Sequence, residues 1–592
     1  MFLRRNRKNK KGETYEYWTL VESVRTSRGP RQRIVATIGK LPGMDKEEYT
    51  GWEEISHIMQ GINSRQMSLF DQGNANIPEW AMVNLHNISV ENIRQFGDTY
   101  LGLLLWKKLE LDKIFKEVQL VGYEEIEWET MFCLSVLARF CAPSSELEIA
   151  ESWYEKTTLP DILGIPIEKA NDDRLYRTLD QLLPHKDEVC KHLQKRYEGL
   201  FGTKFDFLLY DVTSTYFEGQ CKSNEQAKRG YSRDHRSDCL QVCIGLVVTS
   251  EGLPVGYEVF DGNRRDVTTL DEIVEMMEGK YGKANRVWVF DRGIVSEENL
   301  EELQKRNAQY LVGTPRSMLK QFKSYLTEEA WETVYEDVEV KLIKDPSYKD
   351  ELFILCRSTQ REEKEKAILE NHKKRLEEEL QKIQKAIRKG KLTDSEKASK
   401  RIGRWLGRYV RAEKLFEVEL IKDQDGKLKD LSIKYKKERI EWAEKINGKY
   451  ILRTNMTEED PKKLWKMYMQ LNQAERAFRM SKSDLGLRPI FHHRKDRVQA
   501  HIFICFLALA MWKTLELWMD SKGLGKSPEK IMKEFREIKS VDVVIPVKER
   551  GNLRLRVIGK PDIHVRILLA KLGLKLPNRP IFVQNVVENL RG

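Results

Sequence analysis

The stretch Phe207–Gly219, FLLYDVTSTYFEG, decides the fold. It begins with a short run of apolar, β-prone residues, which predicts a buried strand. Asp211 stands where we expect this strand to end, and three hydroxyl residues follow it soon after. A carboxylate at the carboxyl end of a central strand lies where α/β folds open to ligands. An Asp that caps a turn is the simpler interpretation of Asp211 alone, so its function depends on residues further along the chain.

Strands and helices alternate after this stretch. Strands are predicted over residues 241–249, 254–260, 286–290 and 310–313, and helices over 268–278 and 296–306. The strand 286–290 stops at Asp291, as the first strand stops at Asp211. A three-stranded meander followed by helix, strand, helix and strand is the ribonuclease H-like order. Its first and fourth strands are neighbours, so this topology predicts that Asp211 and Asp291 lie side by side.

Residues 315–458 interrupt this order. They contain predicted strands over 332–343, 351–357, 415–422, 428–436 and 449–454. Between these strands lies a charged helical stretch, about 360–412, with one apolar stripe. An exposed helical hairpin rich in salt bridges is the preferred interpretation. Because Lys and Arg dominate from Lys382 to Arg411, an arm that grips DNA is the alternative.

A helix is predicted from Glu459 to Met480, and it carries a third candidate acid. Tyr468, Glu475 and Lys482 are seven residues apart, nearly two turns, so we expect them along one face. Arg479 lies one turn from Glu475 on the same side. Such a face suits a site that holds metal and phosphate together, although a solvated helix face with ordinary charge pairing gives the same spacing.

The N-terminal third contains β and helical segments. Residues 1–11 form a basic arm, followed by a predicted hairpin over 14–26 and 31–38 and a linker over 65–78. The arm and hairpin suit phosphate binding and a solvated tail equally. Residues 88–200 are predicted to be helical, which fits a helix-turn-helix-like DNA module or an ordinary helical bundle.

Composition narrows the class of protein. The 592 residues are too many for one core, 40% are hydrophobic, and 103 Lys and Arg against 92 Asp and Glu give a net charge of +11. This excess is compatible with a polyanionic partner. The eight scattered cysteines indicate a reduced intracellular protein. The longest apolar run, 502–512, is too short to span a bilayer and predicts a buried helix over about 498–521.

The chain resembles bacterial insertion-sequence transposases of the DDE type, which have a ribonuclease H-like core and a β-rich insertion before the glutamate. The resemblance rests on Asp211-Val212-Thr213, Asp291-Arg292-Gly293, and Tyr468-x6-Glu475-x6-Lys482 followed by SDLGLRPIFHHRKDR at 483–497. The family helix usually has an Arg three residues after the Tyr. Leu471 stands there in this chain, and Arg476 or Arg479 would take over the phosphate contact that this Arg makes in the family.

The resemblance implies a DNA transposase with catalytic and metal-binding residues Asp211, Asp291 and Glu475. It implies two Mg²⁺ ions, with Asp211 bridging both ions, and Mn²⁺ as a substitute metal. Tyr468, Lys482, Arg479, Arg292 and Arg476 would contact DNA phosphates. The expected partners are transposon ends and target DNA, bound by a homodimer, with no membrane, in the bacterial cytoplasm near the nucleoid. His492 and His493 are interpreted as structural or phosphate-facing.

The predicted organisation is a mixed α/β chain with a divided ribonuclease H-like core. Its parts are an N-terminal β unit, a helical DNA-binding region, two core segments, an insertion and a C-terminal region: 1–64, 80–200, 201–314 with 459–524, 315–458 and 525–592. Two other functions remain open: a transposase-derived DNA-binding protein that no longer cuts, and a nuclease of the same fold without strand transfer.

Overall fold

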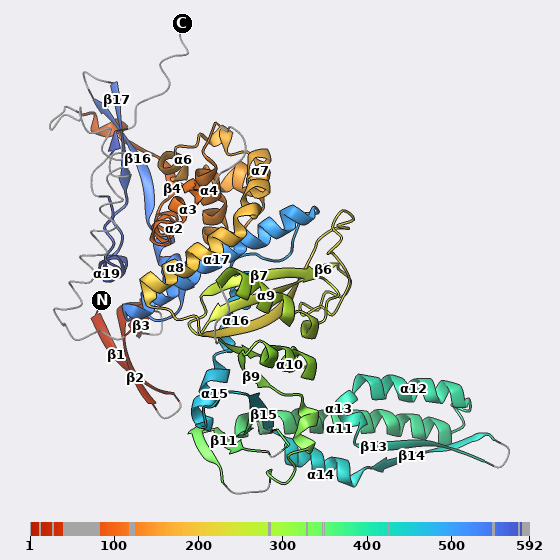
Figure 1. Ribbon diagram of the computed structural model, residues 1–592. Coiled ribbons are helices and arrows are strands. Elements are labelled where there is room, and N and C mark those ends of the chain that lie inside the picture. The colour runs from red at the N-terminus through yellow and green to blue at the C-terminus, as the bar shows by residue number, and fades with distance from the viewer. Residues whose placement is uncertain are drawn as a thin grey trace. The chain divides into compact units, whose positions relative to one another are not determined.

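The structure of the chain is a computed structural model, drawn in Figure 1. It describes the backbone of residues 2–10, 13–26 and 29–39, and it describes residues 83–117, 125–281, 286–326, 330–345, 347–348, 350–423, 426–547, 551–577 and 581–582. The linker predicted over 65–78 lies outside these residues. The chain divides into two compact units: unit 1, residues 1–284 and 471–592, and unit 2, residues 285–470.

Unit 1 begins with three strands, β1 (Phe2–Lys10), β2 (Glu13–Thr26) and β3 (Gly29–Gly39). They pair antiparallel in the order β1-β2-β3. The basic arm predicted over residues 1–11 therefore coincides with the edge strand β1.

Helices dominate the next part of unit 1, as predicted. They are α2 (Gly97–Lys108), α3 (Leu111–Glu117), α4 (Trp128–Cys141), α5 (Glu146–Glu148), α6 (Leu159–Leu163), α7 (Asp172–Leu182) and α8 (Lys186–Phe201). Asn171 caps α7, because its side chain accepts a hydrogen bond from the Arg174 backbone N–H at 2.9 Å.

The prediction of helix from residue 88 is wrong at its start, because β4 (Ser89–Gln95) is a strand. It pairs with β16 (Lys539–Val547), and the sheet order is β18-β17-β16-β4. Ile93 of β4 is 67% exposed. The pairing partner lies more than 440 residues away, so no local pattern could indicate it. The remaining C-terminal elements are α18 (Pro528–Arg536), β17 (Gly551–Ile558), α19 (Ile563–Lys571) and β18 (Ile581–Phe582).

The central strands of unit 1 form an antiparallel meander. β5 (Phe207–Tyr216) pairs with β6 (Gln241–Thr249), which pairs with β7 (Pro254–Asp261); α9 (Leu270–Tyr281) follows. Every residue of β6 is buried. Helices α16 (Asn472–Ser483) and α17 (Lys495–Ser521) belong to the same unit, and α16 packs on β5 and β6.

Helix α17 is the apolar helix expected from the sequence. Among the described residues it is the one helix long and apolar enough to cross a membrane, and 94% of its most apolar window is buried inside the protein. It contacts α4, α7 and β7, so it is a core helix of unit 1.

Unit 2 contains a mixed sheet in the order β10-β11-β12-β15-β9-β8. β8 and β9 run parallel, joined through α10 (Glu297–Lys305), and the other pairs are antiparallel. The strands are β8 (Val287–Phe290), β9 (Gln309–Gly313), β10 (Glu332–Tyr335), β11 (Val338–Ile343), β12 (Leu352–Ser358) and β15 (Lys449–Thr454). The single strand predicted over 332–343 is thus a hairpin of β10 and β11.

An arm, residues 359–435, leaves this sheet between β12 and β15. It consists of α11 (Thr359–Arg388), α12 (Ser395–Arg408), α13 (Val410–Glu413), β13 (Phe416–Lys422) and β14 (Leu428–Tyr435). The arm has its own apolar cluster, to which α11, α12 and both strands contribute. In Figure 1, α11 lies between α12 and the β13–β14 hairpin. Helix α14 (Lys437–Ile446), which was not predicted, returns the chain to β15.

The helix predicted from Glu459 to Met480 is two helices. α15 (Pro461–Met469) ends in unit 2, and α16 begins at Asn472 in unit 1. The Gln470 backbone N–H bonds to the Met467 carbonyl at 3.1 Å, which closes α15 with a tight turn. No Gly or Pro stands at the break, so the sequence pattern did not reveal it. The chain as a whole is a mixed α/β protein with many helices.

Candidate active site

Asp211 lies in the middle of β5, opposite Leu246 of β6. The prediction that the strand ends here is wrong, because β5 continues to Tyr216. The Asp211 side chain is partly exposed, whereas Tyr210 and Val212, on the opposite face, are buried. The Val212 backbone N–H donates to Asp211 Oδ1 at 2.8 Å, which holds the carboxylate at the strand.

Glu475 lies on α16, the helix that packs on β5. The helix buries Ala474, Ala477 and Phe478, and Glu475 is exposed on another face. Asp211 and Glu475 therefore come from two elements of unit 1 that are in contact. Of the four residues predicted on one face, Glu475, Arg479 and Lys482 share α16; Tyr468 lies on α15, so its place in that face was wrongly predicted.

Asp291 directly follows β8 in unit 2, as predicted. It is exposed, and its backbone carbonyl accepts a hydrogen bond from the Ile294 N–H at 3.0 Å, which forms a turn. The Tyr468 hydroxyl donates to Asp291 Oδ1 at 3.2 Å. A Cβ on Gly313 would lie 2.5 Å from this hydroxyl, so glycine makes room for the pair.

The Tyr468 hydroxyl is a stable donor. Burial raises the pKa of Tyr468, and the negative charge of Asp291 raises it further. The phenol therefore stays protonated across the neutral pH range, and the hydrogen bond to the Asp291 carboxylate persists there.

The predicted phosphate-binding cations differ in their surroundings. Lys482 Nζ donates to Asp234 Oδ1 at 2.9 Å, and the exposed fractions of these two side chains are 9% and 4%. Arg488 also pairs with Asp234. Burial lowers the pKa of Lys482, and the bond with Asp234 opposes this effect.

Arg476 is also engaged within unit 1. It pairs with Glu516 at 3.1 Å and donates to the Lys526 carbonyl at 2.7 Å, so it links α16 to α17 and the segment after it. Arg292 and Arg479, in contrast, are exposed. These two guanidinium groups are the ones open to a ligand, Arg292 in unit 2 and Arg479 in unit 1.

The sequence predicts a polar loop rich in Lys, Arg and Ser over residues 221–238 but assigns it no role, and this loop brings two charged residues to β5 and α16. The Arg233 N–H donates to Ser214 Oγ of β5 at 3.2 Å, and its guanidinium pairs with Asp266. Its neighbour Asp234 neutralises Lys482. The loop is visibly rich in charged residues, but no spacing in the sequence connects it to β5 or α16.

Three buried side chains, Glu146, His492 and His501, present ligand atoms within 4.8 Å of one another. His492 Nε2 lies 3.3 Å from Glu146 Oε1, and Arg139 donates to His501 Nδ1 at 3.4 Å. The Arg139 guanidinium thus uses the lone pair that a metal would need and adds a positive charge. The cluster fits the structural role predicted for His492 better than a metal site.

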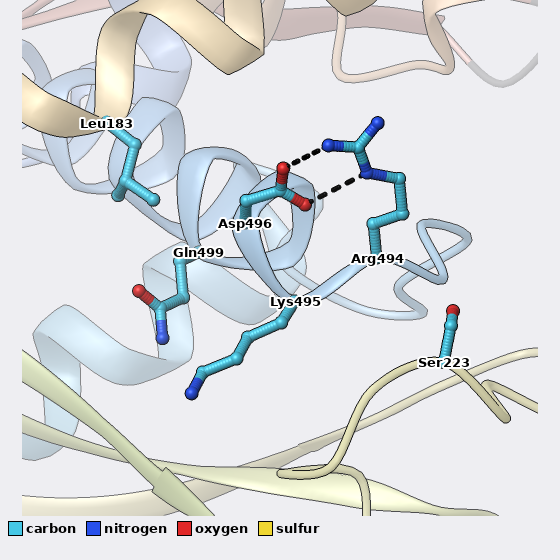
Figure 2. Close-up of a pocket in the computed structure, with 6 residues that line it drawn as sticks. All are labelled: Leu183, Ser223, Arg494, Lys495, Asp496 and Gln499. Carbon is cyan, nitrogen blue, oxygen red and sulfur yellow. Dashed lines mark hydrogen bonds and ion pairs between the residues drawn. The ribbon is translucent and has the colours of Figure 1, made fainter.

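A pocket of about 430 Å³ lies at the start of α17. Figure 2 shows its lining, including the ion pair between Arg494 and Asp496. The residues that line it are Leu183, Ser223, Arg494, Lys495, Asp496 and Gln499. None of the three candidate carboxylates is among them.

Comparison with known proteins gives two family matches. Residues 202–511 match the family described as "Transposase DDE domain", and residues 3–72 match the "IS1634 family transposase, N-terminal domain". No curated protein matches the chain. Among solved structures, the chain is similar to the piggyBac transposase synaptic complex with hairpin DNA, with 11% identity, 74% of this chain and 79% of that chain covered, and a TM-score of 0.35.

Proposed function

Since the chain belongs to the transposase DDE domain family, we propose that Asp211, Asp291 and Glu475 are its three catalytic carboxylates. As an insertion-sequence DDE transposase, the protein is an enzyme that cleaves DNA and transfers a strand to a new site. The observation that carries the assignment is the packing of helix α16 on strand β5. The family match contains both elements. The strand presents the half-exposed Asp211, and the helix presents the exposed Glu475. Asp291 follows β8 within the same match.

We infer a ribonuclease H-like core from the order of elements. β5, β6 and β7 form the antiparallel meander of unit 1, and β8, α10 and β9 form a parallel strand–helix–strand connection in unit 2. In a core of this kind the first and fourth strands are neighbours, so we propose that the two aspartates would act in one site. This topology supplies the reason why acids so distant in sequence act together.

The proposed carboxylates fit divalent metal ions. All three offer oxygen donors, none of them is fully buried, and no His or Cys belongs to the set, which is the donor chemistry that Mg²⁺ prefers. Two ions of this kind would activate the attacking water or 3′-hydroxyl and stabilise the leaving oxygen. Asp211, Asp291 and Glu475 would hold them, and Mn²⁺ would substitute.

The other residues position groups around the acids. The Val212 N–H fixes one oxygen of Asp211, and the Tyr468 hydroxyl fixes one oxygen of Asp291. We propose that the exposed Arg292 and Arg479 contact DNA phosphates directly, where bidentate guanidinium binding is strong. Lys482 and Arg476 already have carboxylate partners, so we propose that they act mainly by holding α16 in place.

We propose that the DNA substrates are the inverted-repeat ends of the element and its target DNA, handled by a homodimer that pairs two ends. The cytoplasm of a bacterium, near the nucleoid, is the expected compartment. Short inverted repeats beside the gene, bounded by small direct duplications, would support this substrate.

The assignment is tested by cleavage and strand transfer on a duplex that carries the DNA flanking the gene. We expect Asp211→Ala, Asp291→Ala and Glu475→Gln each to lower cleavage about a thousand-fold with Mg²⁺, because each removes several kcal/mol of metal-dependent stabilisation. Binding of the duplex should change only a few-fold. Asp206→Asn, an exposed acid before β5, is the matched control and should cleave normally.

Two results would contradict the proposal. Cleavage by Asp291→Ala at the normal rate would remove Asp291 from the site. Wild-type protein that cuts the end but never joins a pre-cut end to plasmid DNA would be a nuclease rather than a transposase.

A further inference from the structure

Helix α12 in the arm carries an excess of positive charge. Its fourteen residues, SEKASKRIGRWLGR, contain five basic residues and a single acidic one, Glu396. The longer helix α11 beside it mixes the two signs along its length. The two helices of the hairpin therefore differ in kind, and only α11 matches the salt-bridged helix expected from the sequence.

Four of the basic residues of α12 form a stripe: Lys397, Arg401, Arg404 and Arg408. Their spacings of four, three and four residues place them along one side of the helix, within about 60°. All four side chains are exposed. The stripe is about 16 Å long at 1.5 Å per residue, which is the axial length of about five base pairs.

Several basic residues of α11 are paired with acids, whereas the three arginines of the stripe are not, among the residues that the structure describes. On α11, Lys366 pairs with Glu362 at 2.6 Å and Lys382 pairs with Glu379 at 2.6 Å. On the stripe, Lys397 is 3.9 Å from Asp394. Within the described part of the chain, no ion pair joins the guanidinium groups of Arg401, Arg404 and Arg408 to an acid; Arg408 lies over the Trp405 ring at 5.4 Å.

The arm holds the stripe in a fixed orientation. Ala398 and Ile402, on another side of α12, are buried in the apolar cluster of the arm. A Cβ on Gly403 or Gly407 would meet no atom within 4 Å, so the neighbouring surface of the helix is open. Figure 1 shows α12 on the side of α11 opposite the β13–β14 hairpin.

We propose that this stripe binds the sugar-phosphate backbone of duplex DNA, as a contact surface separate from the catalytic carboxylates. The proposal rests on the chain being a DNA transposase but not on the assignment of its acids. Unpaired, exposed guanidinium groups at regular spacing suit phosphates and carry no base specificity. Trp405, the large aromatic side chain beside the stripe, packs against the apolar cluster of the arm, and the four stripe residues themselves are basic, so DNA is the favoured ligand over a protein partner or a lipid surface.

The test compares two triple variants of the full-length chain. Arg401→Ala/Arg404→Ala/Arg408→Ala removes three charges from the stripe, and Lys366→Ala/Lys373→Ala/Lys382→Ala removes three paired charges from α11 as the matched control. Affinity is measured against salt on three duplexes of equal length: the end of the element, the end extended by flanking DNA, and an unrelated sequence.

We expect the stripe variant to bind roughly a hundred-fold more weakly at 0.15 M salt, with a slope of log K against log salt smaller by about three, since each phosphate contact contributes about 0.9. The control should change neither. Loss on all three duplexes assigns the stripe to any duplex, including target DNA, and loss on the extended end alone assigns it to donor DNA. The Arg→Lys triple should keep most of the slope, which separates charge from folding.

The proposal fails if the stripe variant and the control show the same slope. It also fails if the stripe variant changes the mass of the protein in solution without changing the slope, because the stripe would then bind a second copy of the chain. Asp291→Ala should keep the wild-type slope, so an error in the proposed acids leaves this result unaffected.

Discussion

At the scale of single residues, the informative contact is the one between Tyr468 and Asp291. A phenol held protonated by burial and by a neighbouring carboxylate is a permanent donor. It fixes one oxygen of Asp291 and leaves the other for a ligand. We therefore interpret Tyr468 as a positioning residue for Asp291 rather than as a phosphate contact.

Tyr468→Phe should lower the cleavage rate about ten- to a hundred-fold, because a hydrogen bond to a charged group contributes roughly 1.5–3 kcal/mol. The Mg²⁺ concentration needed for half-maximal rate should rise, and DNA affinity should stay the same. Because the phenol does not titrate near neutrality, the pH profile should keep its shape. The measurement is cleavage rate against Mg²⁺ and pH.

Tyr450→Phe is the control for this change, since the Tyr450 hydroxyl accepts from Trp465 Nε1 at 2.7 Å and is not the partner of Asp291. A loss of DNA affinity in Tyr468→Phe with an unchanged Mg²⁺ requirement would instead support the phosphate contact predicted from the sequence.

Single residues also show what the sequence could not reveal. Asp291 was predicted after a strand, and it is there. Asp211 was predicted at the end of its strand, but Thr213, Ser214 and Thr215 are buried strand residues paired with β6. Their hydroxyls suggested a loop, whereas β-branched Thr suits a strand. Asp234 was missed because its partners Lys482 and Arg488 are some 250 residues away.

At the scale of elements, local patterns served well where packing follows a simple period. β6 was predicted with its observed bounds, and the apolar stripe Leu376, Leu380 and Ile383 of α11 is buried in the arm. Two elements were wrongly predicted, the strand β4 and the helix that is divided into α15 and α16. β4 pairs with a strand that is distant in the sequence, and the break between α15 and α16 coincides with the boundary between the two units. Tertiary contacts decided both.

The arm should unfold locally when a side chain of its apolar cluster is truncated. Leu380 is fully buried in the cluster formed by α11, α12 and β14, so Leu380→Ala should destabilise the arm by about 2–5 kcal/mol. Hydrogen exchange should show faster exchange for amides of α11 and α12, with β12 and β15 still protected.

Leu369→Ala is the comparison variant, because Leu369 packs on the same cluster but is only partly buried. It should accelerate exchange less. Equal acceleration in β12 and β15 would mean that the arm does not unfold separately from the sheet.

At the scale of the whole molecule, unit 1 is built from the first and last parts of the chain, and buried charges join these parts. Arg139 of α4 and Glu146 of α5 meet His501 of α17 and His492 just before it. Burial lowers the pKa of His501 well below its usual value, and the charge of Arg139 lowers it further. His501 is therefore neutral in the folded protein.

This neutral histidine predicts how stability depends on pH. Its folded pKa is depressed, so the unfolded chain binds the extra proton below about pH 6.5, and stability present above that pH is lost as the pH falls. The expected loss is about 1.4 kcal/mol per pH unit from pH 6.5 downward. Urea midpoints of the wild type should fall between pH 7.5 and 5.5.

His501→Gln should flatten that pH dependence, whatever its own stability at pH 7.5. Glu146 stays ionised between pH 7.5 and 5.5. Burial raises the pKa of Glu146, but the hydrogen bond and the charge of His492 together lower this pKa by more. An unchanged slope in the variant would show that another group titrates.

The place where the arm joins the sheet has a consequence for how the protein can tolerate changes in the length of the arm. Arg357 and Lys449 are register partners on adjacent strands, and the Ser358 N–H bonds to the Gly448 carbonyl at 3.0 Å. The chain leaves and re-enters at one spot, as a tight turn would. A change in the length of the arm, residues 359–435, therefore leaves the hydrogen bonds between β12 and β15 in place.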